Sequence, residues 1–151
     1  MIQRIQTLYL AVVTLLMALS IFLPVATFTV GDAEYSLTGY AIKGGSESEP
    51  TVWLGVLLTL AAILPLVTIF LFKRRTLQVR LCAVEGVLLV GSLVFIGLYY
   101  WRGSDMFEVA IDHQQFGWAA ILPLISLVLV WLAGRAIFKD EVLVRSLDRI
   151  R

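Results

Sequence analysis

Four long apolar segments dominate the pattern of hydrophobic and polar positions along the chain. They cover, approximately, residues 5–27, 51–72, 78–101 and 116–138. Each is long enough to cross a hydrocarbon core of about 30 Å as a helix that rises about 1.5 Å per residue. The pattern therefore predicts an all-α membrane protein, with a single domain over residues 1–151 folded as a four-transmembrane-helix antiparallel bundle.

The polar stretch after the first apolar segment has the alternation of strands. Residues 27–30 and 33–37 alternate apolar and polar positions on either side of Gly31-Asp32, which is typical of two strands joined by a tight turn. Residues 43–50 are rich in glycine, serine and glutamate, and we expect them to be flexible. The sequence thus predicts a small external loop or β-hairpin, which either packs over the helix ends or contacts an external partner.

Composition excludes an ordinary soluble domain. Hydrophobic residues make up 60% of the chain and charged residues only 15%, against about 25% charged in soluble proteins. A single Cys and a single His exclude an internal disulfide and a soft-ligand metal site. Because no nucleophile–base set, phosphate loop or carboxylate pair appears either, we expect no enzymatic activity, no cofactor and no nucleic-acid partner.

Charge is distributed unevenly between the two sides of the predicted bundle. The only dense cationic run, Lys73-Arg74-Arg75, separates the second and third apolar segments. Ten of the twelve Lys and Arg residues fall on the side of this run, and seven of the eleven acids fall on the other. Since cytoplasmic loops carry the excess of Lys and Arg, we predict that both termini are cytoplasmic.

Glu85 and Arg135 are the candidate functional residues within the membrane. Glu85 lies about 10 Å inside the third segment from Gln78 at helical rise, where a carboxylate is costly and needs a partner or a proton. Arg135 lies near the inner end of the fourth segment, at a similar depth. We expect the two to form a structural pair; a lipid-headgroup or partner contact and a proton or ion step are the alternatives.

The C-terminal residues 139–151 predict a cytoplasmic amphipathic helical tail. Glu141 and Arg145 have the favourable spacing of an ion pair on one helix face, and Asp148 and Arg149 add further charge. These four residues are the candidate docking positions. The tail either lies on anionic lipid, docks on a membrane or cytoplasmic protein, or is a solvated helix end without a partner.

Several stretches resemble a family of bacterial four-pass proteins catalogued as domain of unknown function 4293. They are MIQRIQTLYL at residues 1–10, YSLT at 35–38, LPLVTIFLFK at 64–73, QVRLC at 78–82, and KDE, LVRS and DR at 139–141, 143–146 and 148–149. The resemblance implies a small protein of a bacterial inner membrane and implies no reaction, substrate or site residue. It makes intracellular docking more attractive than catalysis outside the cell, because the chain ends carry its most specific parts.

Two functions follow as expectations. The first is a scaffold or accessory subunit of a larger membrane assembly, anchored in the bilayer and joined to its partner through the tail. The second is a small carrier or binder of a lipid or apolar solute, with Glu85 and Arg135 as one headgroup site between the helices.

Overall fold

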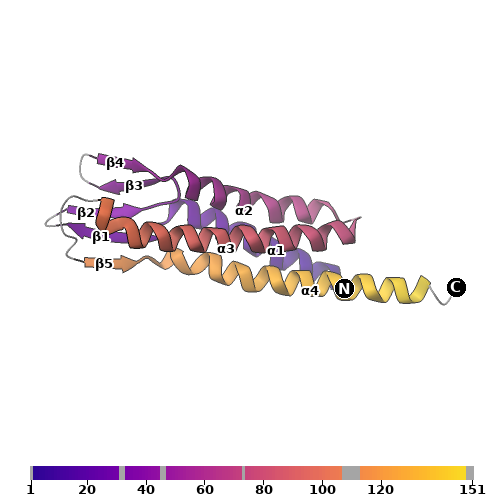
Figure 1. The fold of residues 1–151 in the computed structure, drawn as a ribbon. Helices are drawn as coiled ribbons and strands as arrows, with labels where there is room; N and C mark the ends of the chain where they lie inside the picture. Colours follow the sequence, from indigo (N-terminus) through magenta and orange to yellow (C-terminus); the bar gives the residue numbers. More distant parts are fainter. Residues whose placement is uncertain (1, 31–32, 45–46, 73, 107–112, 149–151) are drawn as a thin grey trace.

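The chain folds into four long helices and a small five-stranded sheet at one end of them (Figure 1). The computed structural model describes residues 2–30, 33–44, 47–72, 74–106 and 113–148. The helices are α1 (Ile2–Phe22), α2 (Val52–Phe70), α3 (Arg75–Met106) and α4 (Leu122–Asp148), with a short 3₁₀ helix η1 (Trp118–Ile121) before α4. We call the end that carries the strands the sheet end and the opposite end the tail end.

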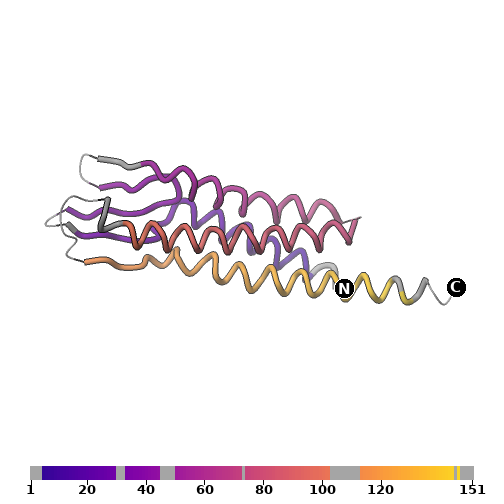
Figure 2. Tube along the Cα trace, viewed as in Figure 1, coloured from indigo at the N-terminus to yellow at the C-terminus, as the bar shows by residue number. Residues whose placement is uncertain are grey.

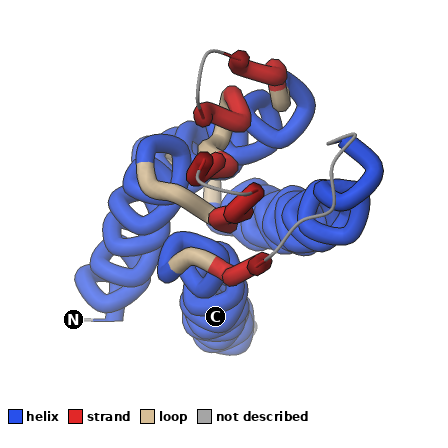
Figure 3. The backbone as a smooth tube through the Cα atoms, turned by 90° about the vertical axis from the view of Figure 1, so that its left-hand side faces the viewer, coloured by secondary structure: helices blue, strands red, loops and turns tan. Residues whose placement is uncertain are grey.

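The four helices surround one common axis (Figure 3). Helix α1 packs against α2 and α4, and α3 packs against the same two helices. Successive helices run in opposite directions, so that α1 begins and α4 ends at the tail end (Figure 1). The predicted four helices of membrane length are confirmed: each contains a stretch that is long and apolar enough to cross a bilayer.

The buried side chains of each helix form one stripe with alternating spacings of three and four residues. The stripes are Gln6, Leu10, Val13, Met17 and Ser20 on α1; Leu54, Leu58, Ala61, Pro65 and Thr68 on α2; Gln78, Cys82, Glu85, Leu89, Ser92 and Ile96 on α3; and Ser126, Val130, Ala133 and Ile137 on α4. This repeat keeps one face of each helix toward its neighbours along their whole length. The opposite faces expose large apolar side chains such as Leu15, Val87 and Val128, as expected for surfaces that contact lipid.

The sheet extends further than the sequence predicts. Its strands are β1 (Ala26–Val30), β2 (Ala33–Leu37), β3 (Ala41–Gly44), β4 (Glu47–Pro50) and β5 (His113–Phe116), in the antiparallel order β4-β3-β2-β1-β5. The predicted hairpin is confirmed, because Ala26 pairs with Leu37 and Val30 with Ala33. The expectation of a flexible stretch at residues 43–50 is wrong where the structure describes it, since β3 and β4 pair there.

Several predicted helix boundaries also change. Helix α1 ends at Phe22 instead of near residue 27, because Pro24 lacks an N–H and Val25 already bonds to the sheet: its N–H donates to the Leu37 carbonyl at 2.7 Å. Helix α3 is longer at both ends than residues 78–101. Residue 116 belongs to β5, and α4 continues through the predicted tail as far as Asp148. Residues 139–148 of the predicted tail are thus helical.

Aromatic rings join the sheet to α3. The rings of Tyr100 on α3 and Phe116 on β5 stack with their centroids 3.9 Å apart. The ring of Phe28 on β1 also contacts Tyr100, with a distance of 6.2 Å between the two ring centroids. Between β5 and η1, Gly117 donates its N–H to the Val25 carbonyl at 2.8 Å. The sheet is therefore fixed to the helices by side-chain packing as well as by the chain connections.

Candidate functional site

Glu85 lies inside the four-helix body with no hydrogen-bonding partner. Its side chain is 1% exposed, and neither carboxylate oxygen has a hydrogen bond to any described residue. A buried polar group without a partner costs free energy, and in a membrane segment such a residue is a functional candidate by default. The sequence singled out this position because a carboxylate is costly there, and among the described residues the structure places no cation beside the carboxylate.

The packing register of α2 and α3 places Glu85 level with Ala61 and Ala62. Gln78 Nε2 donates to the Thr68 carbonyl at 2.9 Å, and farther along a Cβ on Gly91 would lie 4.0 Å from Leu57 Cδ1. Antiparallel helices keep this register between the two contacts. The Ala61 carbonyl at this level lacks its usual helical hydrogen bond, because Pro65, one turn later on α2, has no N–H to donate. Only the neutral carboxylic acid could donate to such a carbonyl, because an ionised carboxylate is an acceptor alone.

Arg135 does not pair with Glu85, so the predicted ion pair is absent from the structure. Its side chain is exposed, and its Cζ lies 5.5 Å from the centre of the Trp131 ring on the same helix. The buried stripe of α4 includes Ala133 and Ile137. Arg135 lies on the opposite face, because each helical residue turns by about 100°. The sequence suggests a pair because the two residues are expected at a similar depth, but their helix faces separate them.

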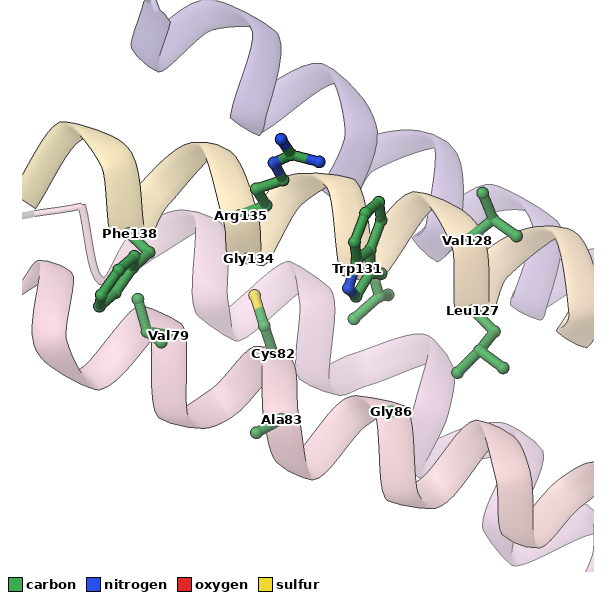
Figure 4. A pocket seen from close by; sticks show the side chains of 11 residues that line it. Val79, Cys82, Ala83, Gly86, Leu127, Val128, Trp131, Gly134, Arg135 and Phe138 are labelled. Atoms are coloured by element: carbon green, nitrogen blue, oxygen red, sulfur yellow. The ribbon is translucent and has the colours of Figure 1, made fainter.

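A groove with a volume of about 730 Å³ lies beside Arg135 between α3 and α4. Small residues make room for it: Ala83 and Gly86 on α3 and Gly134 on α4 line it. Cys82 points from α3 toward Gly134, and Trp131 and Phe138 extend from α4 at the same site (Figure 4). The groove was not predicted from the sequence, although glycines such as Gly86 and Gly134, which leave space beside a helix, could have indicated it.

Polar contacts between α3 and α4 gather at the tail end, where the predicted docking segment begins. Arg75 Nη1 and Asp140 Oδ2 form an ion pair at 3.0 Å. One residue farther on each helix, the Thr76 hydroxyl donates to Glu141 Oε1 at 3.0 Å. These two contacts, which we call the α4 root, join α3 to α4 at the point where α4 leaves the other helices. They were not predicted, because they join residues far apart in the sequence.

Beyond the root, α4 projects past the ends of the other helices (Figure 2). Val142, Leu143 and Val144 are all substantially exposed there. Of the four predicted docking residues, Glu141 is engaged in the root. The side chains of Arg145 and Asp148 and the whole of Arg149 lie outside the described residues, so the predicted pair between Glu141 and Arg145 stays a prediction.

The described residues include no group of three His, Cys, Asp or Glu side chains placed to hold a metal ion. His113 is exposed on β5 at the sheet end. The absence of enzymatic activity stays a prediction.

Comparison with known proteins gives a family and no activity. No curated protein matches the chain. The profile of one family matches residues 2–150, which is almost the whole sequence and includes both the helices and the sheet. That family is described only by its lack of an assigned role. The chain belongs to this family, Domain of unknown function (DUF4293).

Proposed function

We propose that the protein is a scaffold or accessory subunit of a larger assembly in the bacterial inner membrane, with the tail end in the cytoplasm. The four apolar helices support residence in a membrane. The excess of Lys and Arg at the tail end supports its cytoplasmic location. In this arrangement the sheet faces the other side of the membrane, and the projecting part of α4 is available to an intracellular partner.

The observation that carries the proposal is the form of α4. It is one unbroken helix from Leu122 to Asp148, and the α4 root holds it where it leaves the other helices. A helix end of this kind is held at a defined angle instead of moving freely. Its exposed residues Val142, Leu143 and Val144 then offer apolar area in a fixed position. Helix segments with exposed apolar side chains bind in the apolar grooves of partner proteins.

Charge on the tail indicates the chemistry of the partner. Beyond the root the chain carries Arg145, Arg149 and Arg151 against a single acid, Asp148. The complementary surface is an apolar groove bordered by acidic side chains. The sheet end, where acids predominate, would not bind the same surface.

Site-directed photo-crosslinking in cells tests this function. A crosslinking amino acid at Leu143 should capture one defined cytoplasmic or membrane protein, and one at the lipid-facing Val128 should not. Leu143→Asp should abolish co-purification of that protein in mild detergent. Gln115→Asp adds the same charge on an exposed residue of β5 and should leave co-purification unchanged. Equal capture from both positions, or an active external reporter fused after Arg151, would contradict the proposal.

The groove beside Arg135 favours a second candidate function, the binding of a lipid or apolar solute. Its lining is largely apolar, and a single charged side chain lies at its edge. Glu85 is not part of this site. Lipid extraction and mass spectrometry of the detergent-purified protein would show whether any lipid is retained in a fixed ratio to the chain.

A further inference from the structure

We infer that the groove between α3 and α4 holds one anionic phospholipid, with its phosphate between Arg135 and Lys139 and an acyl chain along the groove. This inference rests on the second candidate function and specifies its ligand. It does not depend on the docking of the tail.

The cationic part of the site consists of two residues one helical turn apart. Arg135 and Lys139 are both exposed and lie on the same face of α4, with about 6 Å between their Cβ atoms. Like charges at this spacing repel each other and destabilise a helix. Within the described residues neither cation has an ion pair with an acid. An anion placed between them would remove the repulsion.

The acids on the same stretch of α4 are already engaged elsewhere. Asp140 pairs with Arg75, and Glu141 accepts a hydrogen bond from Thr76, both toward α3. Trp131 lies on the other side of Arg135, where its ring face contacts the guanidinium. The described surroundings thus add no negative charge between Arg135 and Lys139, which leaves the space between them open to an anionic ligand.

The depth of the two cations matches a phosphate layer. Trp118 is 88% exposed at the start of η1, as expected for a ring at the membrane interface. Arg135 lies about 25 Å farther along the helix at about 1.5 Å per residue, and Lys139 about 31 Å. In a hydrocarbon core of about 30 Å, the two side chains therefore reach the headgroups of the opposite leaflet.

The groove continues from Arg135 into the hydrocarbon region, and Lys139 lies one helical turn beyond Arg135, just past the tail-end limit of the groove. Its lining runs from Phe138 and Gly134 past Trp131 to Leu127, and on α3 to Gly86. A hollow of about 730 Å³ with apolar walls suits an acyl chain. A headgroup with net negative charge is favoured over a zwitterionic one, because the ammonium group of a zwitterionic lipid would lie beside two cations.

The test measures binding of two lipids to the full chain in mild detergent, by native mass spectrometry and thermal stabilisation. Phosphatidylglycerol and phosphatidylcholine are added at equal concentration, with inorganic phosphate as a third arm. We expect the wild type to retain phosphatidylglycerol preferentially. The double variant Arg135→Gln, Lys139→Gln should bind it roughly 25-fold more weakly, since each cation near an anionic surface contributes about 1 kcal/mol and 1.4 kcal/mol is tenfold.

Two further variants separate the headgroup from the groove. Gly86→Leu places a side chain in the groove without a clash at its Cβ, which would meet nothing within 4 Å, and should reduce retention of phosphatidylglycerol while the protein stays folded. Arg102→Gln removes an exposed cation at the sheet end of α3 and should leave retention unchanged.

Three results would overturn the inference. In the first, phosphatidylcholine binds as well as phosphatidylglycerol, and only Gly86→Leu reduces binding. The protein would then bind lipid without the proposed headgroup site. Equal stabilisation by inorganic phosphate would show a phosphate site that needs no lipid. A wild type that retains neither lipid would overturn the second candidate function together with the inference.

Discussion

Replacing Glu85 by leucine should stabilise the protein. The carboxyl group is 1% exposed on the buried stripe of α3, and neither of its oxygens has a hydrogen bond to a described residue. Its nearest neighbours on the stripe are Cys82 and Leu89. Leucine has a similar volume to glutamate, fits an apolar core and brings no polar atom that needs a partner.

The expected gain follows from that single buried group. An unsatisfied buried polar group costs about 1–3 kcal/mol, so Glu85→Leu should raise the free energy of unfolding by about that amount. Glu85→Gln keeps a polar group of the same shape in the same place and should change it by less than about 1 kcal/mol. Leu89→Gln buries a new polar group one turn away and should lower it by about 1–3 kcal/mol.

The free energy can be measured by titrating the protein with sodium dodecyl sulfate in mild detergent micelles. Helical circular dichroism and the fluorescence of the four tryptophans provide two independent signals, whose coincidence tests for a single transition. Each variant is compared with the wild type at the same detergent ratio, and Leu89→Gln provides the matched control on the same helix.

One result would refute the reasoning. If Glu85→Leu lowers the free energy of unfolding by about 1 kcal/mol or more while Glu85→Gln leaves it unchanged, the carboxyl group makes a favourable polar contact in the folded protein. If instead Glu85→Leu is more stable but fails to support function in cells, the residue is retained for its activity at a cost in stability.

Other predictions concern the sheet end and the α4 root. Gly117→Ala should lower the free energy of unfolding by about 2–3 kcal/mol, because its Cβ would lie 2.1 Å from the Pro24 carbonyl oxygen; detergent titration would show this, and an unchanged midpoint would contradict it. Gly97→Ala is the matched control, since its Cβ would meet nothing within 4 Å, and it should be neutral or stabilising by up to about 1 kcal/mol. Asp140→Asn should cost less than about 1 kcal/mol, because the ion pair with Arg75 is partly exposed, yet it should increase the spread of distances between spin labels on Leu143 and Val56 in electron resonance. A distance distribution as narrow as that of the wild type would show that the ion pair does not fix the projecting helix.

The four helices and the first hairpin could be predicted because each is encoded locally. An apolar run of membrane length favours a helix wherever it occurs, and the alternation around Gly31-Asp32 needs no distant partner. Strand β5 is different, since His113 to Phe116 contains only one large apolar residue. It is a strand because β1 offers it a hydrogen-bonding edge, and that edge is invisible in the local sequence.

The candidate site was predictable only in part. Counting residues placed Glu85 and Arg135 at matching levels, and the structure keeps the two on neighbouring helices. The contacts of Arg75 with Asp140 and of Cys82 with Gly134 put Glu85 level with Trp131, about one turn from Arg135. The missing information was rotation about the helix axis. On α4 the buried stripe passes through Ala133 and Ile137, so Arg135 faces outward, and only contacts among all four helices decide which stripe is buried.

The pairing of β1 with β5 also has a consequence for the order in which the protein is built. Strand β1 leaves the ribosome early, but its second edge stays open until residues 113–116, made after α3, arrive at the same end of the molecule. During that interval a row of backbone amides and carbonyls is available to any other strand nearby. The last helix therefore follows a strand that has only just paired with β1, and a nascent chain stopped before His113 leaves that edge of β1 unpaired.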